Sequence, residues 1–198
     1  MVRPSSPLIS RANATVAALR IIDAEGLKGL NMRALGAALG VNGASLYHHF
    51  ENKAAIEVAI AEYVLDTQRL PSAPDDDWRT SLVRAQVAYR NALLRHPNAL
   101  PLLLRLPEQP AMQSYFESLV AGARHDGVTA DAMILIVSGL QALAIGSAIV
   151  VQRRMMGDEP NPAWLELDGT RVGDDAAAFA DTCHALIEGV LADSGQTA

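Results

Sequence analysis

Apolar residues recur at steps of three and four positions along most of the chain, which is the spacing of one face of an α-helix. The first such stretch lies between Ser10 and Gly26, with apolar residues at Val16, Leu19 and Ile22. Serine is a frequent N-terminal cap of helices, and glycine often follows a helix C-terminus. Strand-like alternation is nearly absent, so the pattern predicts an all-α protein.

Further helices are predicted before residue 67. Asn31 is placed to cap a short helix that ends at Gly40, and the segment from Gly43 to Phe50 predicts another after a tight turn. Asn52 is placed to cap a longer helix. Two prolines, Pro71 and Pro74, and the aspartates at 75–77 then interrupt the pattern.

This interruption predicts two domains, at residues 1–66 and 67–198, with the helix before it a candidate to be shared by both. In the second domain, apolar stripes predict helices at 78–93, 100–106, 112–123, 132–152 and 179–191. We expect about nine helices in the whole chain. The Pro- and Gly-rich loop at 157–173 is long enough to predict mobility.

The run 132–152 contains no charged residue. About 20 apolar residues can span a bilayer, so a membrane helix is one interpretation. Polar side chains inside the run and many alanines favour a buried or interface helix instead, because they add little hydrophobic free energy. The polar residues are Ser138, Gln141, Ser147 and Gln152.

Residues 31–50 have the pattern of a helix-turn-helix, in which one short helix braces a second that enters the DNA major groove. Five apolar residues are spaced to pack inward: Leu35, Leu39, Val41, Leu46 and Phe50. Five polar residues are left outside: Arg33, Asn42, Ser45, Tyr47 and His48. Two ordinary short helices of a bundle are the alternative.

The same segment resembles the DNA-binding signature of the TetR family of bacterial transcriptional regulators. The resemblance rests on Leu30 to Val41, on Ser45-Leu46-Tyr47-His48-His49-Phe50 and on Asn52-Lys53, with Ile22 to Leu27 similar to the end of the family's first helix. It implies a three-helix DNA-binding head followed by a larger helical domain for dimerisation and ligand binding. It also implies a repressor that a small molecule releases from its operator.

The resemblance implies that Tyr47, His49 and Lys53 contact phosphates, which suits a phenol, an imidazole and an ammonium group. Arg33 matches a position that reaches a guanine edge, and a simple phosphate or acid contact is its alternative. Gly43 departs from the family, which often has a longer polar side chain there.

Base reading would then depend on Arg33, on Ser45 and His48, on the Ala44 methyl group against thymine, or on operator shape. Asn42 is a candidate cap of the recognition helix rather than a reader.

A short recognition helix predicts a homodimer on a near-palindromic operator. The resemblance places the dimer contact in the last two long helices, 132–152 and 179–191. Four small residues, Gly139, Ala142, Gly146 and Ala148, would let backbones approach closely. Alternatively, they face the protomer's own core.

The effector site is a hypothesis that rests on polar residues within apolar stripes. Gln86 and Gln141 are amides that need partners when buried. Candidate lining residues are Gln86, Tyr89, His96, Met112, Tyr115, Phe116, Met133 and Gln141. Core packing or surface placement remains the alternative for each of them.

Charge adds a modest signal: the net charge is -6, yet residues 1–53 carry six Lys/Arg against three acids. The single cysteine, Cys183, excludes an intrachain disulfide. A reducing cytoplasm fits this composition, and residues 1–10 read as a flexible arm rather than a secretory signal.

No enzymatic constellation is recognisable, and no catalytic residue, cofactor or metal is predicted. Asp181 and His184 share a helix face, and this pair favours a solvated surface over a metal site. For Cys183, a role as a small core residue is favoured over a role as a redox sensor. The remaining alternative is an interaction module that has lost DNA binding.

Overall fold

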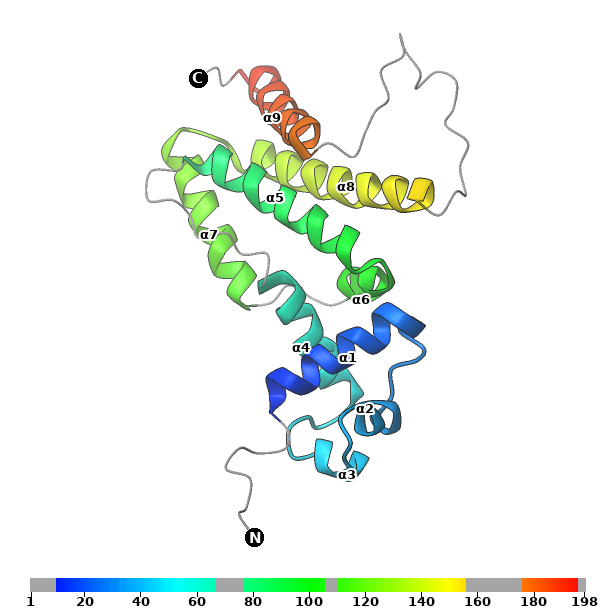
Figure 1. The fold of residues 1–198 in the computed structure, drawn as a ribbon. Helices are drawn as coiled ribbons and strands as arrows, with labels where there is room; N and C mark the ends of the chain where they lie inside the picture. Colours follow the sequence, from blue (N-terminus) through cyan, green and yellow to red (C-terminus); the bar gives the residue numbers. More distant parts are fainter. Residues whose placement is uncertain (1–9, 67–76, 106–109, 156–175, 196–198) are drawn as a thin grey trace. The chain divides into compact units, whose positions relative to one another are not determined.

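We describe the protein from a computed structural model, which places residues 10–66, 77–105, 110–155 and 176–195 (Figure 1). These residues form nine α-helices and one short 3-10 helix, and no strand occurs among them. The all-α prediction is therefore confirmed. The N-terminal arm and the loop predicted at 157–173 lie outside the described residues.

The chain divides into two compact units, which we describe separately. The first unit is Met1–Thr67 together with His96–Pro107, and the second is Gln68–Arg95 together with Glu108–Ala198. The division differs from a simple boundary after residue 66, because the segment from His96 to Pro107 packs with the first unit. Sequence patterning could not show this, since the segment lies between two helices of the second unit.

Four helices begin the first unit: α1 (Arg11–Glu25), α2 (Met32–Ala38), α3 (Gly43–Leu46) and α4 (Lys53–Asp66). Their expected caps are present. Oγ of Ser10 accepts the Asn13 N–H at 3.1 Å, Oδ1 of Asn31 accepts the Ala34 N–H at 2.9 Å, and Oδ1 of Asn52 accepts the Ala55 N–H at 2.9 Å. Each bond satisfies a backbone donor that the helix itself leaves unpaired.

The core of the first unit joins α1, α2 and α4 around apolar side chains. Leu35, Leu46 and Phe50 are buried as predicted, whereas Leu39 and Val41 are only half-buried. Ile22 of α1 and Ile56 and Ile60 of α4 are also fully buried, and α1 contacts both α2 and α4.

The helix predicted over Gly43–Phe50 is shorter in the structure, because α3 ends at Leu46 and continues as a turn through His49. The N–H groups of His49 and Phe50 both bond to the Leu46 carbonyl at 2.9 Å. This turn brings the Phe50 ring into the core and leaves Asn52 free to begin α4.

A 3-10 helix, η1 (Pro97–Ala99), and helix α6 (Leu100–Arg105) complete the first unit. Asn98 Nδ2 donates to the Asp23 carbonyl at 2.8 Å, and His96 Nδ1 lies 3.0 Å from the Asp23 carboxylate. Arg105 bonds to Glu57 of α4 at 2.8 Å. These contacts attach the segment to both α1 and α4.

The second unit contains α5 (Trp78–Arg95), α7 (Pro110–His125), α8 (Ala130–Met155) and α9 (Ala176–Asp193). Helix α5 packs against the other three. Asp77 caps α5, because its Oδ1 accepts the Thr80 N–H at 2.7 Å. The same bond lowers the pKa of the Asp77 carboxyl below its ordinary value.

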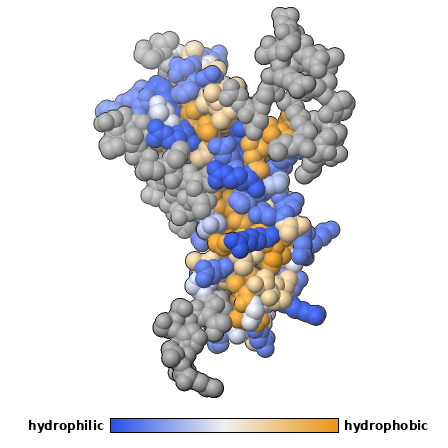
Figure 2. Space-filling model, in the orientation of Figure 1, coloured by the Kyte–Doolittle hydropathy of each residue, from blue (hydrophilic) through white to orange (hydrophobic). Residues whose placement is uncertain are grey.

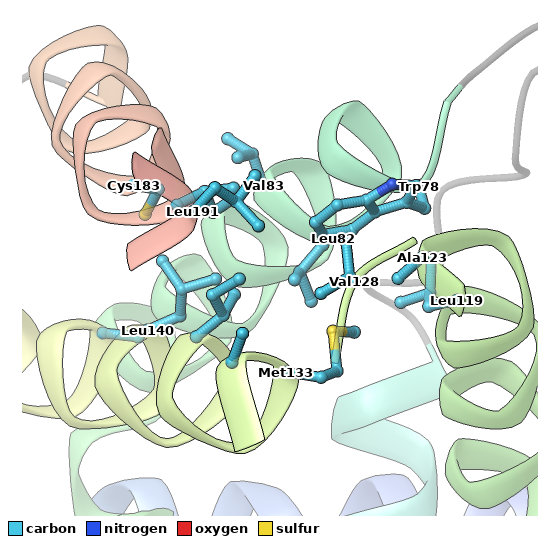
Figure 3. Packing of buried hydrophobic residues seen from close by; sticks show 14 of the residues in the cluster. Trp78, Leu82, Val83, Leu119, Ala123, Val128, Met133, Leu140, Cys183 and Leu191 are labelled. Atoms are coloured by element: carbon cyan, nitrogen blue, oxygen red, sulfur yellow. The ribbon is translucent and has the colours of Figure 1, made fainter. Parts of the chain in front are cut away.

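Figure 3 shows the core of the second unit, where side chains from all four helices meet. Trp78 and Leu82 of α5 lie with Leu119 and Ala123 of α7, and Val83 lies near Leu191 of α9. At its edge, Asp126 accepts from Trp78 Nε1 at 2.9 Å. Burial of this continuous apolar surface stabilises the unit by about 25 cal/mol per Å² removed from water.

Candidate nucleic-acid interface

The turn between α2 and α3 depends on two glycines that bring the backbones together. Gly40 has a φ of +67°, a conformation that glycine adopts without steric cost. A Cβ atom on Gly36 would lie 2.9 Å from the Val41 carbonyl oxygen and 3.0 Å from the Gly43 nitrogen. Side chains at these positions would therefore open the turn that orients α3 relative to α2.

Gly43 lies where α3 begins against α2. A Cβ atom there would lie 3.3 Å from the Met32 carbonyl oxygen, which is tighter than an ordinary van der Waals contact. The absence of a side chain at Gly43 thus allows α3 to begin close to α2. The structure gives a packing reason for the departure that the sequence shows at Gly43.

Asn42 has a structural role at the start of α3. Its Oδ1 accepts the Ala44 N–H at 3.1 Å, and its backbone is extended as expected of an N-cap. The side chain therefore acts as the cap of the recognition helix, which was the alternative to a reading role.

The predicted reading residues lie on the outer side of the first unit. Arg33 is on α2, and the others are on residues 43–50, which we call the reading segment. Arg33, Ala44 and His48 are exposed, and Tyr47 is 57% exposed. Ser45 is half-buried. The exposed ring and hydroxyl of Tyr47 are therefore accessible to a partner.

Lys53 is the first residue of α4 and is half-exposed. Its Nζ donates to the Leu27 carbonyl at 3.4 Å and lies 3.7 Å from a carboxylate oxygen of Glu57. The other Glu57 oxygen bonds to Arg105 of α6 at 2.8 Å. One carboxylate therefore pairs with two cations, and Lys53 is held beside the first turn of α4.

His49 is half-buried, and its backbone carbonyl accepts a hydrogen bond from Arg11 Nη1 at 3.3 Å. The Arg11 guanidinium also lies over the Phe50 ring, with Cζ 4.9 Å from the centroid. Sequence reasoning counted Arg11 only as one positive charge. No spacing rule connects residues 11 and 49, so only the tertiary structure reveals this contact.

The candidate effector residues are not all brought together. Gln86 is 5% exposed in the second unit, and in the described part of the chain its Oε1 is a buried oxygen without a hydrogen-bond partner. Met133 is buried in the core of the second unit, and the half-buried Tyr89 packs against this core. Burial raises the pKa of the Tyr89 hydroxyl above its ordinary value.

Two of the candidate residues lie elsewhere. Gln141 is exposed on α8, which is the surface placement kept as its alternative. His96 belongs to the first unit, where it contacts Asp23. The side chains of Met112, Tyr115 and Phe116 are outside the described part of the structure.

A buried guanidinium near Gln86 was not predicted. Arg90 of α5 is 3% exposed, its Nε donates to Ser147 Oγ of α8 at 2.7 Å, and its Cζ lies 5.0 Å from the Phe179 ring centroid of α9. The side chain therefore contacts two other helices of the second unit. The placement of Arg90 in the apolar stripe of α5 was the available signal.

Cys183 is fully buried, and burial raises the pKa of its thiol to about 11 while Arg90 acts in the opposite direction. Such a thiol is neutral and unreactive at physiological pH. Asp181 and His184 are exposed. The part of the chain that the structure describes holds no group of three or more potential metal ligands.

Comparison with known families identifies both halves of the chain. Residues 15–60 match the sequence model of "Bacterial regulatory proteins, tetR family", and residues 70–163 match that of "Tetracyclin repressor-like, C-terminal domain". The chain belongs to the TetR family. Arg11 lies outside both matched ranges. TetR-family proteins are transcriptional regulators and not enzymes.

Curated relatives support the assignment most strongly over part of the chain. The tetracycline repressor protein class A of Escherichia coli is 42% identical over 82 residues, which are 40% of this chain and 38% of the relative. The class C repressor of E. coli is 41% identical over 81 residues, or 40% and 37%. The chain thus matches well under half the length of these relatives.

Solved structures share the fold over nearly the whole chain. BioQ of Mycobacterium smegmatis has a TM-score of 0.68 at 26% identity, covering 93% of this chain and 98% of that one. A TetR variant from Acinetobacter baumannii AYE in complex with minocycline has a TM-score of 0.73 at 23% identity, with 96% coverage of both chains. The predicted arrangement of a helix-turn-helix followed by a helical domain is confirmed.

Among the described residues, one helical stretch, Ala130–Arg153 of α8, is long and apolar enough to cross a membrane by length and composition. Helices at the core or interface of soluble proteins pass the same test. Only 28% of this apolar stretch is buried within the chain, which leaves an apolar surface exposed.

Proposed function

We propose that this protein is a homodimeric repressor that binds near-palindromic operator DNA and leaves it when a small molecule binds the second unit. The observation that carries the proposal is the helix-turn-helix itself. Its recognition helix is capped by Asn42, crosses α2 closely at Gly43 and presents an exposed Tyr47. A surface of this kind fits the major groove.

Phosphate contacts are the best-supported part of the interface. The Tyr47 hydroxyl and the His49 ring are polar donors at the end of the reading segment, and Lys53 adds a charge at the start of α4, where helix amides favour anions. The exposed Arg33 is the candidate for a guanine edge, and Ser45, His48 and the Ala44 methyl group are the other candidates for base contact. Gly43 contributes backbone only.

Dimerisation is proposed through a set of exposed residues on one side of α8, which recur about once per helical turn. We call this set the α8 face. Ile134 is 65% exposed and Leu135 is 60% exposed, and no charge interrupts the face between Asp131 and Arg153. Its remaining members are Ser138, Gln141, Ala142, Gly146, Ile149 and Val150. Figure 2 shows hydrophobic residues at the surface of the second unit beside hydrophilic ones.

The four small residues considered for this contact divide between two roles. Ala142 and Gly146 are exposed on the α8 face, whereas Ala148 is buried and a Cβ atom on Gly139 would lie 3.1 Å from Leu186 of α9. A second copy covering the α8 face would remove its apolar surface from water, which is the usual driving force of obligate dimers. Helix α9 presents small exposed residues for the same contact, among them Ala185 and Gly189.

The effector is proposed to donate a hydrogen bond to Gln86 Oε1. A buried amide oxygen without a partner costs about 1–3 kcal/mol, so a ligand N–H or O–H at this atom would recover that free energy. Arg90 and Ser147 form a polar pair in the second unit, and the Arg90 guanidinium lies over the Phe179 ring, so these contacts would change if a ligand bound beside them. A ligand shifts the protein only if it binds one conformation better than the other.

The η1–α6 segment is proposed to carry the effector signal to the DNA contacts. It lies between α5 and α7 in sequence, yet it packs in the first unit, where Arg105 shares Glu57 with Lys53. If Arg105 moved away, the Glu57 carboxylate would pair only with Lys53. The Lys53 ammonium would then be less available to a phosphate, and operator affinity would fall.

A selection of operator DNA from a random pool, followed by binding measurements at several salt concentrations, tests the proposal. We expect Lys53→Ala to weaken binding to all sequences and to lower the salt slope by about one per protomer. Arg33→Ala should blur one operator position at a cost of about 1–3 kcal/mol. Arg124→Ala, an exposed cation of α7, is the control.

Tetracycline and minocycline are the first effector probes, because relatives are named for the one and solved with the other. Release of the operator complex by a compound that Gln86→Leu no longer binds would support the effector site. Failure of the full chain to bind any DNA in a salt-dependent manner would contradict the function as a whole.

A further inference from the structure

Arg11 lies at the first turn of α1 and reaches the end of the reading segment. Its Nη1 donates to the His49 carbonyl at 3.3 Å, and its guanidinium lies over the Phe50 ring with Cζ 4.9 Å from the centroid. Residues 11 and 49 are 38 positions apart in sequence. The contact therefore joins two elements that the chain itself does not hold together.

The reading segment needs such a contact because it is barely helical. Helix α3 has four residues, and Tyr47 to His49 continue as a turn whose N–H groups bond back to Ala44 and Leu46. The carbonyl groups at the end of a helix or turn lack partners within it. The Arg11 donor supplies one to His49, the residue whose ring is expected at the DNA.

Arg11 also has donors left over. An arginine fork carries five N–H groups in one plane, and the residue is exposed to solvent. The Phe50 ring fixes the plane of the fork from one side, so the guanidinium is held in position before DNA arrives. A planar, preorganised fork is well matched to a phosphate group, more so than a flexible ammonium.

We propose that Arg11 is a further residue of the DNA interface, with two roles that act together. It positions the end of the reading segment through the His49 carbonyl, and it presents its remaining N–H groups to a phosphate of the DNA backbone. The proposal rests on the proposed function, since it needs the reading segment to face DNA. It adds a contact that neither matched family range includes, because those ranges are residues 15–60 and 70–163.

Salt dependence separates a phosphate contact from a merely structural role. Each phosphate contact adds about 0.9 to the slope of log affinity against log salt, so Arg11→Ala should lower the slope by about two in a dimer. We expect affinity at low salt to fall about tenfold for all sequences. The measurement uses the full chain and a duplex that the unsubstituted protein binds.

The matched control is Arg20→Ala, which removes the same charge from an exposed position of the same helix. Arg11→Lys is the second variant. It should keep most of the salt slope but lose part of the affinity, because one ammonium group cannot bond to the His49 carbonyl and a phosphate in the fixed geometry of the fork. Circular dichroism melting of each variant shows whether the fold is retained.

Equal affinity and slope for Arg11→Ala and Arg20→Ala would overturn the proposal. A loss of affinity with an unchanged slope would overturn the phosphate contact, since only positioning would then be affected. Both outcomes differ from failure of the proposed function, in which the unsubstituted protein itself would bind no DNA.

Discussion

The two units of the protein place their polar side chains in opposite ways. In the first unit, the side chains of Asn42 and Arg11 are exposed and bond to backbone groups near the surface. In the second unit, Gln86 and Arg90 are buried among the apolar residues of long helices. The comparison teaches that the polar groups of the recognition motif are available to an external partner, whereas Gln86 and Arg90 are sealed from water.

The exposure of apolar side chains distinguishes the units further. In the first unit the exposed large apolar residues, Tyr47, Tyr63 and Leu104, are scattered over different elements, whereas in the second unit Ile134 and Leu135 lie exposed with Ile149 and Val150 on the one helix α8. A unit that is incomplete alone is expected to need a second copy, while a reading head is not. Three pairs of substitutions test this contrast, beginning with the largest expected effect.

Charges on the α8 face should give the largest loss. Ile134→Glu combined with Leu135→Arg places ionised groups where a second copy is expected, and an unpaired buried charge costs about 3–5 kcal/mol. We expect sedimentation equilibrium to show a monomer. We also expect most of the operator affinity to be lost. Ala121→Glu on α7 adds a charge at an exposed position outside this face and should leave the dimer intact. A dimer that persists in the double variant would place the interface elsewhere.

The same substitution in each unit should give an intermediate contrast. Arg90→Ala removes the bond to Ser147, the contact with Phe179 and much packing, so we expect the free energy of unfolding to fall by about 2–4 kcal/mol. Arg33→Ala removes an exposed side chain and should change it by no more than about 0.5 kcal/mol. Urea denaturation of both variants measures the difference, and similar losses would refute the contrast.

The smallest pair should change stability in opposite directions. Gln86→Leu removes a buried oxygen without a described partner and should raise the free energy of unfolding by about 1 kcal/mol. Asn42→Ala removes the cap of α3 and should lower it by about 1 kcal/mol, with weaker DNA binding. Thermal melting of both variants provides the test. A destabilised Gln86→Leu protein would mean that the amide is fully bonded in the folded state.

Much of the first unit could be predicted from local sequence. The caps at Ser10, Asn31 and Asn52 and the burial of Leu46 and Phe50 followed from residue type and helical spacing. These features depend on groups a few positions apart, so no knowledge of the fold is needed. The helix after Gly43 was predicted too long, because the turn to Phe50 is imposed by packing against α1 and α4.

The second unit was less predictable at the level of single residues. Helix positions followed from apolar stripes, but the exposure of Gln141 and the burial of Arg90 did not. A long helix with apolar residues on most of its surface has no unique inward side until its neighbours are placed. The same lack of a neighbour explains why the resemblance could place the contact on 132–152, while only the structure shows which residues of this helix are exposed.

The sequence by itself determined the helical class, the helix ends and the residues of the recognition motif, because each is encoded within one or two turns of chain. Only the tertiary structure decided that His96 to Pro107 join the first unit, that one carboxylate of Glu57 meets both Lys53 and Arg105, and that Arg11 reaches His49. Such contacts arise from the packing of distant segments, and packing depends on the whole set of neighbours at once.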